Sequence, residues 1–243
     1  MRHLKKITAS PRYFAFTLAE VLITLGIIGI VAALTIPTLV NNYQKAQYVT
    51  ALKKAYTQFN QALIQLASDN NCVGDLACTN FLGTGTTTEP LGDELIKNFK
   101  ILKNCKMDSN LDCWPKLTNI NFDGSGPSYK VVQGVTYAFV TLDNIAVGIY
   151  NFSSCVQTWA SLGEVICGQV FFDVNGLKGP NAWGVDTFSF WITKSSNLKP
   201  ERSIPEENIC NRYHPYGRYC AGRVITDGWQ MNYYGTLPTS PNY

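Results

Sequence analysis

The sequence predicts an α+β protein in which one long amino-terminal helix packs on an antiparallel β-sheet with disulfide-rich loops. Residues 16–68 favour a single helix, because an apolar run is followed by an amphipathic helical repeat. Residues 129–193 contain four segments rich in Val, Ile, Phe and Tyr, which is typical of strands. A helix followed by a run of antiparallel strands is an α+β arrangement.

The apolar run follows a basic stretch of fifteen residues that contains no acidic side chain. Residues 16–36 are almost wholly apolar, and about 20 such residues are enough to cross a bilayer. Basic residues beside a membrane span stay on the cytoplasmic side, so the rest of the chain is expected outside. The expected divisions are a leader over residues 1–15, a long helix over 16–68 with a membrane span over 16–40, and a globular head over 69–243.

Glu20 stands near the start of this apolar run, where a charge is unexpected. On insertion scales, a carboxylate at the centre of a spanning helix costs about 2.5–3.5 kcal/mol, and less near the end. A signal peptide would have a shorter apolar core without an acid, and a plain membrane anchor leaves Glu20 unexplained. An acid inside a membrane span is functional by default, so a partner is expected for it.

The stretch FTLAE at residues 16–20, with a basic leader before it and an apolar helix carrying Gly29 and Pro37 after it, resembles the amino terminus of type IV pilins and of type II secretion pseudopilins. The resemblance implies that a prepilin peptidase cuts immediately before Phe16 and that the new amino group is methylated. The family normally has Gly before the cut, where this chain has Ala15.

In the resembled family, the retained Glu20 would neutralise the amine of Phe16 on a neighbouring subunit during assembly. Such pairing offsets much of the desolvation cost that each buried charge has alone. Gly29 allows close approach of apolar helices, and Pro37 removes a backbone hydrogen bond and permits a kink. Both residue types are also simply common in membrane helices.

The function implied is that of a structural subunit, not an enzyme, in a type IV pilus or a type II secretion pseudopilus. The expected partners are the prepilin peptidase, other subunits in a helical filament, and an inner-membrane assembly platform. The expected location is the bacterial inner membrane, with the head in the periplasm or outside, and then the pilus or pseudopilus. Two alternatives are a minor pilin whose head binds DNA, a surface or a secreted substrate, and a membrane-anchored exported enzyme.

Beyond Pro37 the elements can be placed in order. Apolar residues from Tyr48 to Leu66 recur at helical spacing and continue the first helix. A loop is expected over 69–89, and then Leu91, Leu95, Phe99 and Leu102 predict a second helix that ends before Cys105. Four strands are expected over residues 129–140, 144–150, 164–173 and 187–193, with a hairpin turn over 142–145.

Eight cysteines, an even number, all lie beyond the apolar run, which suits an oxidising compartment and four disulfides. Sequence-local pairing closes short loops and is the expected arrangement. A zinc site is disfavoured because the chain has no CxxC motif and only two histidines. The expected pairs are Cys72 with Cys78, Cys105 with Cys113, Cys155 with Cys167, and Cys210 with Cys220.

The loop between the last two expected strands offers oxygen ligands that suit calcium, namely Asp173, Asn175, Asn181 and Asp186. Some pseudopilins hold calcium in a late loop, which makes calcium the cofactor that the resemblance suggests. The spacing is not that of an EF-hand, and turn chemistry alone also explains Asn-Gly and Gly-Pro-Asn between two strands.

The carboxy-terminal region carries Arg212 and Arg218 among tyrosines, which could stack on DNA or on sugars. A disulfide-clipped surface loop explains the same residues. Without the leader, 16 basic residues face 17 acidic ones, so bulk charge does not favour nucleic acid binding. His214 is the one imidazole beyond the leader, and the acids form no paired motif, so catalysis finds little support.

Overall fold

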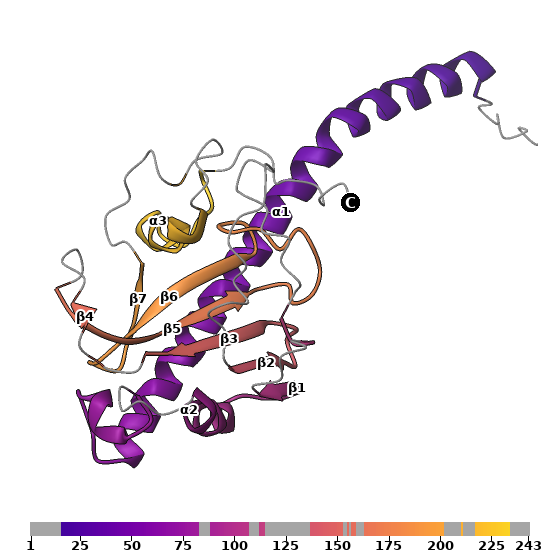
Figure 1. Cartoon of the computed structure of the whole chain (residues 1–243). Helices are drawn as coiled ribbons and strands as arrows, with labels where there is room; N and C mark the ends of the chain where they lie inside the picture. Colours follow the sequence, from indigo (N-terminus) through magenta and orange to yellow (C-terminus); the bar gives the residue numbers. More distant parts are fainter. Residues whose placement is uncertain are drawn as a thin grey trace, which may run out of the picture. The chain divides into compact units, whose positions relative to one another are not determined.

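The computed structural model describes most of the chain (Figure 1). Three α-helices and three 3-10 helices are present among the described residues. The helices are α1 (Leu18–Asp69), η1 (Leu76–Thr79), α2 (Thr88–Leu95), η2 (Ile96–Asn98), η4 (Gly217–Tyr219) and α3 (Cys220–Thr226). The described residues are 16–82, 88–106, 112–114, 137–152, 155, 157–158, 163–201, 210 and 217–233. The chain divides into two compact units, residues 1–40 and 41–243, and each is considered by itself.

The strands of the second unit form one antiparallel sheet, as Figure 1 shows. Its spatial order is β1-β2-β3-β5-β6-β7, and the short β4 also pairs with β5. The strands are β1 (Ile101–Lys106), β2 (Tyr137–Thr141), β3 (Ala146–Asn151), β4 (Gln157–Thr158), β5 (Val165–Asp173), β6 (Thr187–Thr193) and β7 (Leu198–Pro200). The α+β fold class is therefore confirmed, with a long helix on an antiparallel sheet.

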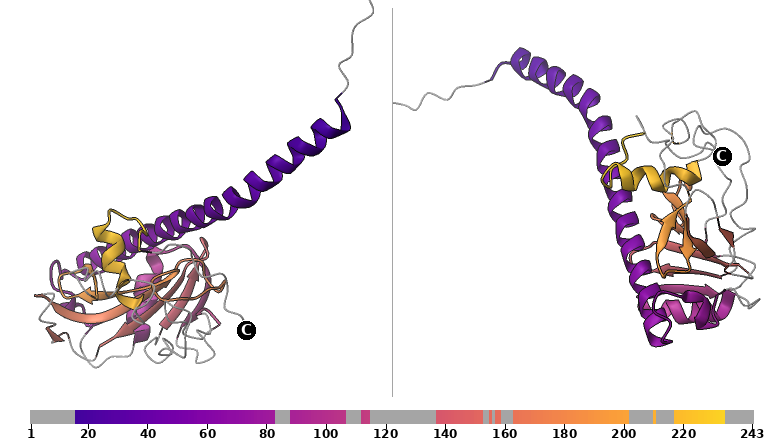
Figure 2. Two further views of the ribbon diagram at one scale, coloured as in Figure 1. Left: turned by 90° about the horizontal axis from the view of Figure 1, so that it is seen from above. Right: turned by 90° about the vertical axis from the view of Figure 1, so that its left-hand side faces the viewer.

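The carboxy-terminal half of α1 covers one face of this sheet (Figures 1 and 2). Its buried residues step by three and four, as one face of a helix requires. The rings of Phe59 and Phe172 lie 5.7 Å apart, and those of Tyr56 and Phe190 lie 5.2 Å apart. The buried side chains of the helix are Val49, Leu52, Ala55, Phe59, Ala62, Leu63, Leu66 and Ala67.

Alternation along the strands divides their side chains between two hydrophobic clusters. On β5, Val170 and Phe172 join the main core under α1, whereas Phe171 joins a second cluster that also contains Trp114 and Trp183. On α2, a Cβ atom added at Gly92 would lie 2.3 Å from the Tyr137 ring. Glycine at this position therefore allows a strand side chain to pack directly on a helix backbone.

The predicted hairpin turn joins β2 to β3. The backbone N–H of Thr141 donates to the carbonyl of Ile145 at 3.0 Å, and Asn144 adopts a φ of 61°. Asparagine tolerates this left-handed conformation better than most residues, so turn chemistry identifies the hairpin correctly. The predicted strand over 187–193 coincides with β6. Of the strand predicted over 129–140, the part from Tyr137 onward lies in β2, and residues 129–136 lie outside the described part.

The prediction for the second helix is wrong at the carboxy-terminal end. The observed helix α2 stops at Leu95, and one 3-10 turn, η2, continues to Asn98. The next element is the strand β1, which contains Leu102. The apolar spacing fits a helix, but pairing with β2 satisfies the backbone of this segment instead. Two short strands, β4 and β7, and the helix α3 are not predicted by the sequence patterns.

Candidate functional site

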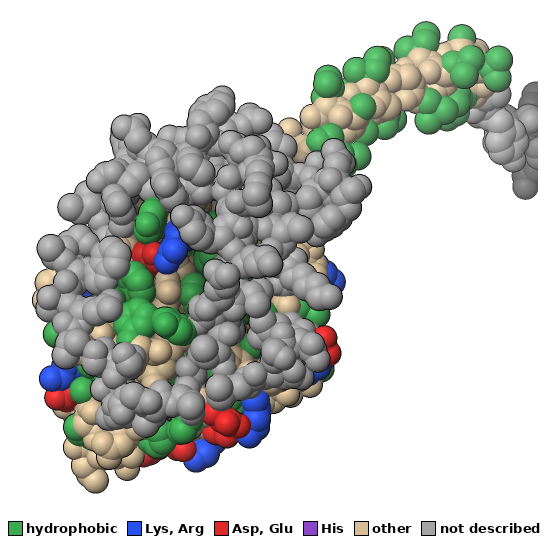
Figure 3. All heavy atoms as spheres, in the orientation of Figure 1, with side chains coloured by type: hydrophobic (Ala, Val, Ile, Leu, Met, Phe, Trp, Pro, Cys, Tyr) green, Lys and Arg blue, Asp and Glu red, His purple; other side chains and the backbone are tan. Residues whose placement is uncertain are grey.

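The amino-terminal part of α1, up to Val40, presents its apolar side chains outward (Figure 3). Phe16 is 85% exposed, and the first buried residue of the helix is Val49. By length and composition, this helix can cross a membrane. Apolar side chains that find no core in their own unit are expected to find lipid or another helix.

Glu20 forms a capping box with Thr17 at the start of this helix. The backbone N–H and the hydroxyl of Thr17 both donate to Glu20 Oε2, each at 2.8 Å. The backbone N–H of Glu20 donates in return to Thr17 Oγ1 at 3.2 Å. The reciprocal bonds satisfy helix amides that have no acceptor within the helix. No donor among the described residues reaches Glu20 Oε1.

Gly29 and Pro37 lie within the same part of α1. A Cβ atom added at Gly29 would meet nothing within 4 Å, so the glycine leaves an open place on the helix surface. Pro37 stands inside the helix, where it cannot donate the usual bond to a carbonyl one turn earlier. Ala15, the residue before the expected cut, lies outside the described residues.

The loop between β5 and β6 is organised around the buried carboxylate of Asp186. Its Oδ2 accepts the backbone N–H of Asn181 at 2.8 Å and the side-chain amide of Asn175 at 3.1 Å. Its Oδ1 accepts the backbone N–H of Ala182 at 2.6 Å. Burial raises the pKa of Asp186 to about 7, and the three amide donors oppose that shift.

Asp173 is the second fully buried carboxylate of this loop. Its oxygens accept the backbone N–H of Asn175 at 3.3 Å and the hydroxyl of Thr187 at 3.0 Å. Burial, followed by the negative charge of Asp186, raises the pKa of Asp173 well above its usual value. The structure therefore gathers all four predicted calcium ligands, Asp173, Asn175, Asn181 and Asp186, into one hydrogen-bonded loop.

Two oxygens of this loop lack a partner. Oδ1 of Asn175 and Oδ1 of Asn181 are buried and accept no hydrogen bond from the part of the chain that the structure describes. Buried amide oxygens are normally satisfied, so these two require an explanation. The described residues contain no group of three or more His, Cys, Asp or Glu side chains suited to a metal, so any cation here would depend on the amides.

Two tyrosines connect this loop to other elements. The side-chain amide of Asn175 also donates to the hydroxyl of Tyr48 on α1 at 3.3 Å. The hydroxyl of Tyr233, beyond α3, donates to the carbonyl of Gly184 at 2.8 Å. Neither contact is visible from sequence spacing, because the two tyrosines lie far from the loop along the chain. The β5–β6 loop is thus hydrogen-bonded both to α1 and to the segment beyond α3.

Four disulfides join the cysteines in the expected sequence-local pairs. The Cα–Cα distances are 5.8, 5.8, 4.2 and 5.3 Å. The described residues contain no free cysteine. The pairs are Cys72–Cys78, Cys105–Cys113, Cys155–Cys167 and Cys210–Cys220.

Arg218 has a structural partner. Its Nε and Nη2 donate to the two carboxylate oxygens of Glu201 at 2.9 and 2.8 Å. Glu201 is buried, and it also accepts hydrogen bonds from Gln169 and Ser189 on the sheet. Removing Arg218 from a buried bidentate pair is costly, which argues against a role as a ligand-binding residue. Arg212 lies outside the described residues.

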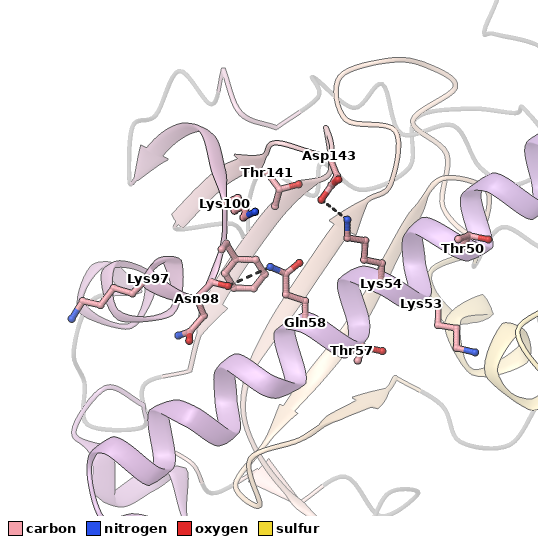
Figure 4. A pocket seen from close by; sticks show the side chains of 11 residues that line it. Thr50, Lys53, Lys54, Thr57, Gln58, Lys97, Asn98, Lys100, Thr141 and Asp143 are labelled. Carbon is pink, nitrogen blue, oxygen red and sulfur yellow. Dashed lines mark hydrogen bonds and ion pairs between the residues drawn. The ribbon is translucent and has the colours of Figure 1, made fainter.

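A groove of about 780 Å³ lies between α1 and the segment from η2 to β1 (Figure 4). Lys54 on its helix wall pairs with Asp143 at 2.7 Å, and Gln58 donates to the carbonyl of Asn98 at 3.3 Å. Lys100 has no ion-pair partner among the described residues. This lysine groove is lined by Thr50, Lys53, Lys54, Thr57, Gln58, Lys97, Asn98, Phe99, Lys100, Thr141 and Asp143.

Sequence reasoning overlooks three residues that the structure places in these sites. Thr17 could have been found, because Thr-x-x-Glu before an apolar run is the capping-box pattern. Tyr48 is expected only as a core residue, although its hydroxyl contacts Asn175. Glu201 carries no local signal, since its partners come from β5, β6 and η4.

Comparison with known proteins adds one finding. Residues 11–36 match a family described as the prokaryotic N-terminal methylation motif. This match covers the whole stretch from the end of the basic leader to the residue before Pro37. Neither a curated protein nor a solved structure shows significant similarity to the chain.

Proposed function

We propose that this chain, which carries the amino-terminal signal of type IV pilin and pseudopilin precursors, is a structural subunit of a type IV pilus or of a type II secretion pseudopilus. The observation that carries the proposal is the motif over residues 11–36 on a helix whose apolar side chains have no core of their own. The subunit is cut between Ala15 and Phe16 and methylated on Phe16. Its apolar helix then packs against other copies in a filament.

The proposed assembly step pairs two charges. Cleavage gives Phe16 a cationic amine, and Glu20 supplies a carboxylate four residues later. Each charge alone is costly in hydrocarbon, whereas a pair with a neighbouring subunit offsets much of that cost. Glu20 is therefore a register group for assembly. Gly29 and Pro37 contribute close helix approach and local bending or melting.

The proposed partners follow from this path. A prepilin peptidase processes the precursor, an inner-membrane platform assembles it, and further pilin or pseudopilin subunits surround it. The precursor spans the bacterial inner membrane once through residues 16–40, with the head of residues 69–243 in the periplasm or outside. Its work is mechanical, not enzymatic.

Mass spectrometry of the native protein tests the proposal. A mature chain that begins with methylated Phe16 is the expected result. An intact precursor in a strain that assembles filaments, or a cut elsewhere in the apolar helix, would overturn it. Deleting the gene then distinguishes between a pilus subunit and a pseudopilus subunit. Loss of surface fibres indicates a pilus, and loss of protein secretion indicates a pseudopilus.

A second candidate function is that of a minor subunit whose head binds an anionic ligand such as DNA. The lysine groove supports it, because four lysines and one acid line the same open surface. Arg212 is a further candidate contact, whereas the pairing of Arg218 with Glu201 makes it a weaker one. The near-neutral balance of the chain beyond the leader argues against strong nucleic acid binding.

The double variant Lys54→Glu, Lys100→Glu tests this candidate. A matched control is Lys103→Glu, Lys199→Glu, which reverses the same number of charges at lysines outside the groove lining. If the head binds DNA, uptake or retention of DNA falls about tenfold or more in the groove variant alone, while filaments persist. Equal binding by both variants would exclude the groove.

We further propose that the β5–β6 loop binds calcium through Asp173, Asn175, Asn181 and Asp186. The supporting observation is the pair of partnerless amide oxygens beside two buried carboxylates. Calcium takes roughly six to eight oxygen ligands, so backbone carbonyls or water would complete the set. A bound cation would also offset the repulsion between the two carboxylates.

The variant Asn181→Gly isolates this role. It removes an oxygen that has no partner, keeps the backbone N–H that donates to Asp186, and suits the φ of 50° at this position. If calcium binds, its stabilising effect on unfolding in urea shrinks in the variant, whereas stability in chelator changes little. A stabilising effect of calcium that is equal in both proteins would place the ion elsewhere.

A further inference from the structure

We infer that Thr17 is a positioning residue for assembly: it holds Oε2 of Glu20 within its own chain and thereby presents Oε1 to the Phe16 amine of a neighbouring subunit. This inference rests on the proposed function, since it concerns how the charge pair forms. It assigns a role in partner recognition to a residue that would otherwise count only as a helix cap.

The geometry separates the two oxygens of one carboxylate. Oε2 accepts both the backbone N–H and the hydroxyl of Thr17 at 2.8 Å. Oε1 accepts nothing from the described residues. A carboxylate has room for about four hydrogen bonds, so the free oxygen is the available acceptor for a donor from outside. An arriving amine can bind there without displacing Thr17.

The capping box also fixes where the carboxylate lies. A glutamate side chain loses up to about 2 kcal/mol of rotamer entropy when it is ordered, and here its own chain has already ordered it. The bonds to Thr17 draw the carboxylate back to the start of the helix, next to Phe16 in sequence. The acceptor therefore lies at the end of the helix where processing creates the amine.

The same bonds lower the cost of the unassembled state. Within a membrane, a carboxylate with two donors on one oxygen is less costly than a bare one. One unsatisfied oxygen still remains, and only a further donor can satisfy it. Thr17 thus lowers the free-energy cost of the unassembled subunit in lipid and still leaves Oε1 of Glu20 free to bind a donor from a neighbouring subunit.

A purely local role for Thr17, as a helix cap, is the alternative, and Thr24 provides the control for it. The hydroxyl of Thr24 donates to the backbone carbonyls of Glu20 and Val21 at 2.9 and 3.0 Å. It lies in the same apolar segment and makes no contact with the carboxylate. Thr24→Val therefore removes a hydroxyl from the membrane helix without changing the orientation of Glu20.

The test uses the full-length chain in its own membrane, with zero-length carbodiimide coupling between the Phe16 amine and Glu20 of different copies. Mass spectrometry first selects variants that are cut normally, because Thr17 adjoins the cut. Thr17→Val is expected to lower the coupled fraction about fivefold, Thr17→Ser to restore it, and Thr24→Val to leave it unchanged.

Equal coupling in Thr17→Val and the parent chain would overturn the inference, as would an equal loss in Thr24→Val. The variant Glu20→Gln distinguishes failure of the charge pair itself from failure of the role of Thr17. If Glu20→Gln assembles normally, the charge pair itself fails and the proposed function loses its mechanism. If Glu20→Gln fails to assemble while Thr17→Val assembles and couples normally, only the role of Thr17 is lost.

Discussion

Asp186 and Glu20 are both carboxylates in positions where a charge is costly, and their hydrogen bonds differ. Asp186 in the β5–β6 loop is fully buried, and three amide donors reach its two oxygens. Glu20 lies among exposed apolar side chains, and both bonds to its carboxylate fall on one oxygen. The loop supplies its own donors, whereas the amino-terminal helix leaves one acceptor for something outside.

The difference indicates where folding ends and assembly begins. The unit from residue 41 onward contains a core, a paired sheet and four disulfides, so it satisfies most of its groups internally. The unit before it leaves apolar surface and a carboxylate oxygen unused. Unsatisfied groups of both kinds are what a subunit needs for association in a membrane.

The largest expected effect follows from removing the charge in the amino-terminal unit. We predict that Glu20→Ala reduces assembled filaments at least about tenfold, because the amine of each neighbouring Phe16 loses its counter-charge. Electron microscopy and shear fractions measure filament yield, and proteolysis of the head measures folding. Normal filaments from Glu20→Ala, with cleavage intact, would refute charge pairing as the basis of assembly.

The corresponding change in the β5–β6 loop should affect folding instead. Asp186→Ala leaves the backbone N–H groups of Asn181 and Ala182 without acceptors and is expected to destabilise the head by about 3 kcal/mol. Urea unfolding of the full chain in detergent measures this change. Asp186→Asn retains an acceptor oxygen, so it should cost less. An unaltered unfolding midpoint in Asp186→Ala would show that the loop does not depend on this carboxylate.

The same carboxylate gives a pH dependence with a definite sign. Burial raises the pKa of Asp186 to about 7 from 3.8, so in chelator the folded state binds a proton that the unfolded state has already released. Stability should therefore be highest below pH 3.8 for this group and decline as pH rises to about 7. If calcium binds as proposed, it favours the ionised form, so its stabilising effect should grow over the same range and reach about 2.7 kcal/mol at a hundredfold excess over Kd.

Urea midpoints at several pH values, with chelator, calcium or magnesium, test this behaviour. Magnesium serves as the control because it demands a smaller and more regular oxygen shell. A calcium effect that is constant with pH would contradict the link to Asp186. No calcium effect at any pH would leave the loop as a hydrogen-bonded turn and remove the calcium proposal.

Sequence patterns predict best where one interaction dominates. The apolar repeat on α1 identifies its buried face, and the aromatic and β-branched run of β6 identifies a strand whose residues are all buried. The end of the second helix is mispredicted because Phe99 and Leu102 fit a helical repeat, although their segment pairs with β2. Tertiary pairing decided that segment, and local spacing does not reveal it.

The sites show the same division. Glu20 and the Asp and Asn residues of the β5–β6 loop stand out because acids in an apolar run and Asp or Asn in a glycine-rich loop are local signals. The lysine groove could not be predicted, since α1, η2 and the β2–β3 turn supply it from distant parts of the chain. Helix α3 is short and contains Gly222, so its sequence gives little helical signal. Packing and the Cys210–Cys220 disulfide hold it in place.

A third carboxylate, Asp143 in the β2–β3 turn, is expected to show the smallest effect of substitution on stability. It pairs with Lys54 at 2.7 Å, but both side chains are about half exposed to solvent. Water already solvates both charges, so Asp143→Ala is expected to change unfolding free energy by at most about 0.5 kcal/mol and to leave filament yield unchanged. The small difference should vanish at high salt, as surface pairs are screened. A loss in urea unfolding comparable to that of Asp186→Ala would contradict this expectation, because only desolvation gives such a pair a large contribution.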